Sequence, residues 1–238
     1  MPAPRDPVLH STPILNLRPT QITVGMHEVY KKRDAWKKRT SIDLEKFLAS
    51  HMVPVIKGLN GEYFLIDHHH LARALHEGGL SSVFVTVIAD LSRLTQDHFW
   101  NFMSFHGWTH PYDSKGRRRA YSDLPKTVKA MEDDPYRSLA GELRNGGGFA
   151  KDSTPFSEFL WADFLRPRIK AKTIRADFQA ALTDALVLAN SGDADYLPGW
   201  SGPHGFGPQP NKKVKAKAKG KKASSRKPSK DDDLVLSG

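Results

Sequence analysis

The stretch that decides the fold reads Asn60-Gly61-Glu62-Tyr63-Phe64-Leu65-Ile66-Asp67-His68-His69-His70-Leu71-Ala72-Arg73. Its Asn-Gly dipeptide is the one that two-residue hairpin turns prefer, and the apolar run after it is typical of a β-strand. Asp67 and three histidines follow the strand directly and lead into a helix whose apolar face holds Leu71, Ala74 and Leu75. The stretch therefore predicts a hairpin and a strand-to-helix junction lined with polar side chains.

The flanking sequence extends this stretch into an α/β unit. A Thr40-Ser41-Ile42-Asp43 capping box opens a helix, and Gly78-Gly79 ends the helix that follows the histidines. Pro54 indicates that its position is either the start of a strand or part of a strand at the sheet edge. Four further strands are predicted, at residues 14–17, 22–24, 53–56 and 83–88.

From residue 93 onward the pattern is helical. Phe99, Phe102 and Met103 recur at helical spacing, and similar groups follow at residues 156–160 and 178–186. Pro125, Pro135 and Pro155 each stand where the first turn of a helix tolerates proline. We expect a helical domain packed on the α/β unit, with a break at residues 145–148.

The basic charge is concentrated near the C-terminus. The chain has 36 Lys and Arg residues, of which ten lie in residues 211–238, and 26 Asp and Glu residues, of which three lie there. This segment therefore carries +7 of the net charge of +10, and residues 1–210 carry +3. A Lys/Ala/Gly/Ser tract buries too little apolar surface to fold, so we expect a disordered tail that either attracts nucleic acid or only adds solubility. The predicted organisation is a disordered N-terminus (1–11), an α/β domain (12–92), a helical domain (93–197), a Gly/Pro linker (198–210) and the tail.

The residue types that are missing exclude several classes of protein. There is no cysteine, which excludes disulfides, thiol catalysis and iron–sulfur clusters. We see neither a signal peptide at the N-terminus nor an apolar run of spanning length. We therefore expect a cytoplasmic protein, associated with the nucleoid if the tail binds DNA, and no membrane partner.

The polar junction at Asp67–His70 is the strongest candidate site. Unpaired N–H groups and the positive end of a helix dipole favour an anion at a helix start, and Arg73 lies nearly one turn further on. A phosphate is the natural ligand for such a site. Two alternatives stay open: Asp67 caps the helix while a histidine fills the core, or Asp67 and His110 hold a metal ion.

These residues carry a resemblance. Together with Pro19–Gly25 and Val53–Val55, the segment Gly61–His70 resembles the ParB/sulfiredoxin superfamily, and more narrowly its ParB-like nucleases. The resemblance covers about residues 12–110 and implies a mixed-sheet α/β domain whose box at a helix start holds nucleotide phosphates. In the superfamily, chromosome-partitioning members bind and hydrolyse CTP, and sulfiredoxins use ATP with a catalytic cysteine that this chain lacks. The resemblance therefore implies a nucleotide ligand here, ATP, ADP or CTP, with Mg²⁺.

The superfamily box can be carried over residue by residue. Asp67, His69 and His70 match its Asp, His and His, whereas His68 replaces a glycine and Leu71 an arginine. The resemblance also implies a second group of ligand-facing residues before the box, with Glu28 as general base or metal-holding carboxylate, and Asp67 and His69 as its catalytic partners. The implied phosphate-binding residues are Gln21, Gly25, Lys31, Lys32, His68, His69, His70 and Arg73.

Three functions remain open at this point. The first is binding of a nucleotide or other phosphate ligand, with hydrolysis or phosphoryl transfer. The second is a metal-dependent nuclease, with Asp67, the histidines of the box and His110 around the ion and the C-terminal tail holding the substrate. The third is a noncatalytic adaptor that contacts DNA through residues 211–238.

Overall fold

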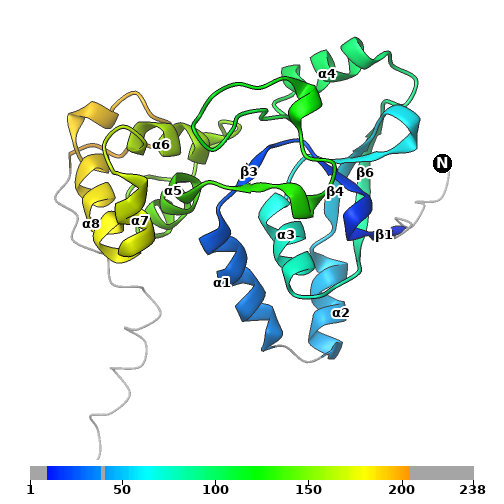
Figure 1. Ribbon diagram of the computed structural model, residues 1–238, viewed down its shortest axis with the longest axis horizontal. Coiled ribbons are helices and arrows are strands. Elements are labelled where there is room, and N and C mark those ends of the chain that lie inside the picture. The colour runs from blue at the N-terminus through cyan, green and yellow to red at the C-terminus, as the bar shows by residue number, and fades with distance from the viewer. Residues whose placement is uncertain (1–9, 39–40, 204–238) are drawn as a thin grey trace, which may run out of the picture. The chain divides into compact units, whose positions relative to one another are not determined.

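A five-stranded mixed sheet forms the centre of the N-terminal half (Figure 1). The computed structural model describes residues 10–38 and 41–203. Neighbouring strands are antiparallel in the β1–β6 and β4–β5 pairs and parallel in the β6–β4 and β5–β2 pairs. In sheet order the strands are β1 (His10–Pro13), β6 (Ser82–Asp90), β4 (Val53–Lys57), β5 (Tyr63–Leu65) and β2 (Leu17–Pro19). The mixed sheet confirms the predicted α/β class.

The predicted hairpin is present. Its connection is longer than the predicted two residues: Lys57 pairs with Tyr63, so residues 58–62 join the strands, with a 3₁₀ turn at Leu59–Gly61. Asn60 and Gly61 have positive φ angles, 56° and 74°. The N–H of Glu62 closes the turn on the Leu59 carbonyl at 3.1 Å. The turn sets the register in which Lys57 pairs with Tyr63, and so fixes where the second strand ends and the histidines begin.

Three helices are packed with this sheet, namely α1 (Met26–Lys37), α2 (Ser41–Ser50) and α3 (His69–Glu77). The predicted apolar face of α3 is buried in a core shared with the sheet, and Gly78 ends the helix. Burial of each such Leu or Val side chain contributes about 1.5–3 kcal/mol. Thr40 of the predicted capping box lies outside the described residues, as do residues 1–9 and 204–238.

Two strand predictions in this half need correction. Residues 14–16 form a 3₁₀ turn rather than a strand, because the chain leaves one edge strand, β1, and must reach the opposite edge strand, β2. Residues 23–24 do form a strand, β3 (Thr23–Val24), but it pairs with β7 (Glu132–Asp133) in a separate two-stranded sheet. A strand from the second half of the chain, β7, therefore pairs with a strand from the first half, β3.

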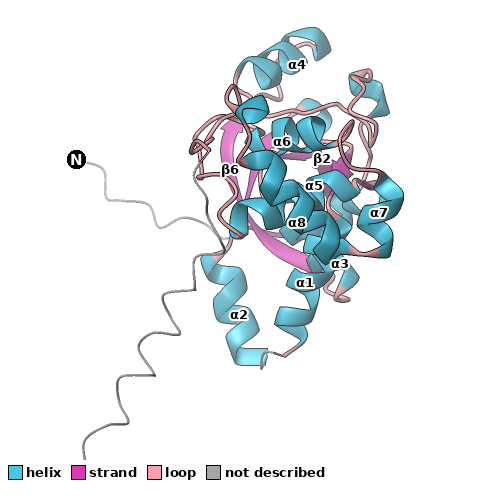
Figure 2. Cartoon of the chain, turned by 90° about the vertical axis from the view of Figure 1, so that its left-hand side faces the viewer, coloured by secondary structure: helices cyan, strands magenta, loops and turns pink. Residues whose placement is uncertain are grey.

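The C-terminal half is built from helices that share one core (Figure 2). Its core includes Leu139, Leu143, Trp161, Leu165 and Ala185. Pro135 occupies the first turn as predicted, after Asp134, whose carboxylate accepts the Tyr136 N–H at 3.0 Å. The helices of this core are α5 (Pro135–Asn145), α6 (Ser157–Leu165), α7 (Ala171–Ala176) and α8 (Phe178–Ala189). Helix α4 (Gln96–Phe105) instead packs Phe99 and Met103 against Ile56 and Phe64 of the sheet.

The prediction of helix from residue 93 onward is wrong for residues 106–134. Pro125 starts no α-helix, and this segment contains only short 3₁₀ turns and β7. The reason is that its backbone pairs with residues 20–24: the N–H groups of His110, Glu132 and Asp134 donate to the carbonyls of Thr20, Ile22 and Val24 at 2.8–3.0 Å. The domain boundary at residues 92–93 stays a prediction. Among the described residues, no helix is both long and apolar enough to cross a membrane.

Candidate functional site

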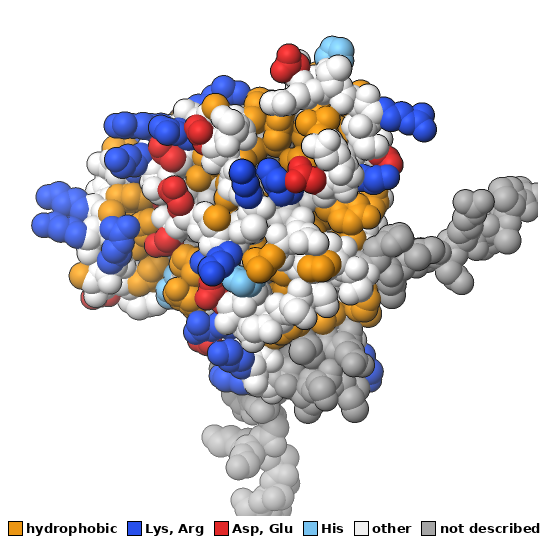
Figure 3. Space-filling view, turned by 45° about the vertical axis from the view of Figure 1, so that its right-hand side comes forward, with side chains coloured by type: hydrophobic (Ala, Val, Ile, Leu, Met, Phe, Trp, Pro, Cys, Tyr) orange, Lys and Arg blue, Asp and Glu red, His pale blue; other side chains and the backbone are white. Residues whose placement is uncertain are grey.

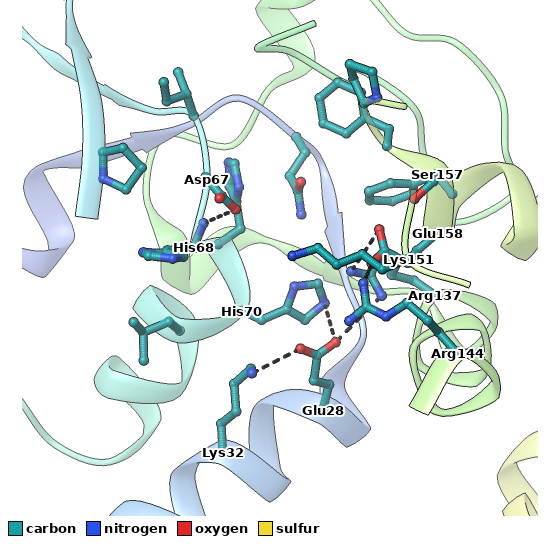
Figure 4. Close-up of a pocket in the computed structure, with 18 of the residues that line it drawn as sticks. Glu28, Lys32, Asp67, His68, His70, Arg137, Arg144, Lys151, Ser157 and Glu158 are labelled. Carbon is teal, nitrogen blue, oxygen red and sulfur yellow. Dashed lines mark hydrogen bonds and ion pairs between the residues drawn. The ribbon is translucent and has the colours of Figure 1, made fainter. Parts of the chain in front are cut away.

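A pocket of about 1010 Å³ lies between the start of α3 and α1 on one side and α5 and the segment before α6 on the other (Figure 4). From the N-terminal half it is lined by Gln21, Glu28, Lys32, Asp67, His68, His69 and His70, among others. The structure therefore brings Glu28 and the histidine box, far apart in the sequence, into one pocket.

Local backbone geometry positions the histidine box. His68, the residue before α3, adopts the left-handed conformation, with φ 63° and ψ 24°, and its N–H donates to the Asp67 carboxylate at 2.6 Å. This bend turns the chain from the strand into the helix and leaves His69 and His70 in the first turn, where both are buried. Asp67 thus orders the junction locally, but it does not cap the helix: His68 is at the N-cap position, and no side chain there accepts a hydrogen bond from the first turn.

His69 and His70 bind the backbone of the neighbouring segment. The Gly25 N–H donates to His70 Nε2 at 2.9 Å, and the Thr20 N–H donates to His69 Nε2 at 3.3 Å. Burial lowers the pKa of each imidazole to about 3. Both rings are therefore neutral at pH 7, with Nε2 as the accepting nitrogen, and they hold residues 20–25 against the start of α3.

Glu28 is surrounded by nitrogen atoms. Its Oε1 lies 3.2 Å from Lys32 Nζ, and its Oε2 lies 3.6 Å from both His70 Nε2 and Arg137 Nη1. Burial raises the pKa of this carboxyl, but the charges of His70, Arg137 and Lys32 together outweigh burial and lower the pKa to about 2. Because His70 is neutral at pH 7, Arg137 and Lys32 are the cations that hold Glu28 ionised there.

The opposite wall of the pocket was not predicted from the sequence. It comes from the C-terminal half and carries Arg137, Arg144, Lys151 and Glu158 (Figure 4). Glu158 pairs with Arg144 and lies 4.0 Å from Arg137 Nη2. Lys151 points across the pocket and has no ion-pair partner among the residues that the structure describes.

Arg137 is the most unusual of these residues. Its side chain is only 10% exposed, yet within residues 10–38 and 41–203 nothing accepts a hydrogen bond from its Nε or Nη1. Arg137, Gly141 and Arg144 share a helix face, and a Cβ on Gly141 would lie 3.2 Å from Arg137 Nη1 and 3.3 Å from Glu28 Oε2. This Arg-xxx-Gly-xx-Arg spacing, with a small residue between two arginines, is the one sequence signal that could have predicted this wall of the pocket.

The two walls meet at the N-terminal ends of α1 and α5. A Cβ at Gly25 would lie 2.5–2.8 Å from atoms of Ser138, so only glycine permits this approach. The N–H groups of Met26 and His27 donate to Asp133 and to Ser138 at 3.0 and 3.3 Å, and the His27 ring stacks on Phe178 at 4.0 Å. Gly25 itself does not line the pocket, so its place in the site is structural.

Three other predicted residues also lie outside the pocket lining. Lys31 pairs with Glu142 at 2.8 Å. Arg73 donates to the carbonyls of Val128, Lys129 and Met131 at 2.8–3.0 Å and so fastens that segment to α3. His110 packs its ring 4.1 Å from that of Phe159, and burial lowers its pKa to about 4.

Metal ligands do not gather in the described part of the chain, where no group of three or more His, Asp or Glu side chains is placed to share an ion. The pairing of Asp67 with His110 around a metal stays a prediction. Gln21 does line the pocket, but its side-chain nitrogen donates to the Thr23 carbonyl at 2.7 Å.

The fold and this pocket define a ParB-like protein. A family model described as ParB-like nuclease matches residues 10–167, more than half of the chain, and the protein belongs to that family. The chain is also similar to the crystal structure of protein Atu1540 from Agrobacterium tumefaciens, with 45% identity and a TM-score of 0.76 over 82% of this chain and 99% of that one. No curated protein matches the sequence.

Proposed function

We propose that the pocket binds a phosphate-bearing ligand, a nucleotide such as ATP, ADP or CTP with Mg²⁺, and hydrolyses it or transfers its phosphoryl group. The observation that carries the proposal is Arg137, whose buried Nε and Nη1 find no acceptor among the described residues. A buried donor without a partner costs about 1–3 kcal/mol, and a guanidinium matches the oxygens of a phosphate better than any other anion-binding side chain does.

The charges around Arg137 support the same ligand. Lys32, Arg144 and Lys151 also line the pocket. Of its four carboxylates, Glu28 and Glu158 are paired with these cations, while Asp67 and Asp152 accept hydrogen bonds from nearby backbone N–H groups. The face of the molecule in Figure 3 carries basic and acidic side chains side by side. A phosphate would therefore be selected by the donors inside the pocket and not by a broad basic surface.

In this proposal Glu28 holds Mg²⁺ or orients the attacking group. A carboxylate with a pKa of about 2 is a weak proton acceptor, so general-base action requires that bound phosphate first draw Arg137 and Lys32 away from it. His69 contributes indirectly, because its ring holds Thr20, whereas His70 faces Glu28 directly. Asp67, which also lines the pocket, would be a further ligand of the metal ion in this proposal.

Isothermal titration of the full chain with ATP, ADP and CTP, with and without Mg²⁺, tests this proposal. We expect at least one nucleotide to bind well below millimolar Kd, and a phosphate-release assay to show turnover that is lost in Glu28→Gln. Absence of any binding tighter than about 1 mM, the level of a few weak contacts, would overturn it.

A nuclease activity is the second candidate, and the family description favours it. The same donors would then bind a phosphodiester. Nicking of plasmid DNA that disappears in chelator and in His69→Ala would favour this activity over nucleotide turnover. The adaptor alternative rests on residues 211–238, which lie outside the described residues.

A further inference from the structure

Beside its charged residues, the pocket is lined by a group of aromatic and apolar side chains, which we call the second lobe. It consists of Trp36, Phe47, His51, Pro54, His68 and Ile88. We propose that this lobe binds the base of the nucleotide whose phosphates Arg137 binds, and so selects ligands that carry a flat heteroaromatic ring. The inference rests on the proposed function, but it concerns different residues of the same pocket.

His68 gives the first argument. It has a φ of 63°, a conformation that costs a non-glycine residue about 1–2 kcal/mol, at a position where the resembling box has glycine. Its imidazole points away from Glu28 and Arg137 (Figure 4) and makes no contact with the charged cluster. Strain of this kind persists where the side chain serves a function.

Unpaired nitrogen atoms give the second argument. His68 Nδ1 and Trp36 Nε1 are both buried, and neither has a hydrogen-bond partner in the described part of the chain. More than nine in ten buried polar groups in proteins are hydrogen-bonded, so two exceptions in one lobe mark a place for ligand atoms. The indole N–H only donates, whereas a neutral imidazole can donate or accept, which matches the mixed edge of a nucleobase.

The walls of the lobe suit a flat ring. Phe47 and His51 stack on each other with centroids 4.0 Å apart, and Pro54 and Ile88 add apolar surface from β4 and β6. Ile88 remains 50% exposed although it stands in a strand. A base bound here would bury the apolar surface of Ile88 and contact the aromatic rings of Phe47 and His51.

Titration of the full chain with ATP and with inorganic tripolyphosphate separates the two lobes. We expect the wild type to bind ATP at least tenfold more tightly than tripolyphosphate. His68→Gly relieves the backbone strain, so it should leave Tm unchanged or raise it by up to about 4 °C. Because it also removes the imidazole, it should reduce the affinity for ATP to that for tripolyphosphate. The affinity for tripolyphosphate should not change.

Two further variants complete the test. Asn60→Gly makes the same backbone change at a left-handed residue that does not line the pocket, and should alter neither affinity. Ile88→Asn, at a half-exposed position, should weaken ATP binding alone. Equal ATP and tripolyphosphate affinities in the wild type, or an equal effect of His68→Gly on both ligands, would overturn the base site. Failure of the wild type to bind ATP, ADP, CTP or tripolyphosphate would overturn the proposed function itself.

Discussion

Among single residues, Arg137 carries the greatest weight, because it joins two carboxylates from different parts of the chain. Its guanidinium lies 3.6 Å from Glu28 and 4.0 Å from Glu158, at 10% side-chain exposure. Truncation of a buried cation leaves its partners uncompensated, whereas an exposed ion pair is worth little. Arg137 should therefore matter for stability as well as for ligand binding.

We predict that Arg137→Met lowers the free energy of unfolding by about 1–3 kcal/mol, since Glu28 is left in a partly buried site without its main counter-charge. Adding Glu28→Gln should recover part of that loss. Lys57→Met is the matched control, because it breaks an exposed pair with Asp90 and should change stability much less than Arg137→Met does. Urea denaturation measures all three; equal losses for Arg137→Met and Lys57→Met would contradict the account.

The residues that sequence alone could identify are those of the histidine box. Asp67 to His70 stand together in the chain, next to a turn whose geometry Asn60-Gly61 dictates. Arg137 is harder to find in this way, because its one signal is the spacing with Gly141 and Arg144 on one face of an otherwise ordinary helix. Its role depends on the tertiary fold, because Gly25 lets α1 approach Ser138 and this approach brings Glu28 to 3.6 Å from Arg137.

At the scale of elements, the contact between α1 and α5 holds the pocket together. Nearly all of the expected helices and strands form, since turn chemistry and apolar periodicity specify them locally. Residues 106–134 differ because their conformation is set by pairing with residues 20–24, and no local pattern records such a distant partner. The same pairing carries α5, and with it half of the pocket, to the N-terminal sheet.

Gly25→Ala tests this contact. The added methyl would meet Ser138 at 2.5–2.8 Å, mostly against backbone atoms that cannot rotate away, so we expect a loss of about 1–3 kcal/mol in unfolding free energy and weaker nucleotide binding. Gly192→Ala, where a methyl meets nothing within 4 Å, should change stability by less than about 0.5 kcal/mol. Indistinguishable denaturation midpoints for the two variants would show that the approach is not tight.

At the scale of the whole molecule, the buried neutral histidines determine how stability depends on pH. The folded pKa values of His69 and His70 are about 3 and that of His110 about 4, all below the ordinary 6.5. The unfolded chain therefore binds more protons than the folded one below pH 6.5. The stability these groups contribute is complete above that pH and is lost as the pH falls towards 3–4.

We predict that the unfolding free energy falls between pH 6.5 and 4.5 by up to about 1.4 kcal/mol per pH unit for each histidine. His110→Phe, in a cage of aromatic rings, should remove one such contribution and flatten the curve. Urea denaturation at several pH values gives the two slopes. Parallel curves for the wild type and the variant would mean that His110 is protonated in the fold.

The central claim is that the cations inside the pocket bind phosphate, and two adjacent lysines of α1 test it most directly. Lys32 lines the pocket beside Glu28, while Lys31 pairs with Glu142 outside it. Calorimetric titration with the tightest-binding nucleotide should show an affinity about tenfold or more lower for Lys32→Met, as expected for one lost charge-assisted contact, and no change for Lys31→Met. Equal affinities for the two variants would contradict the account.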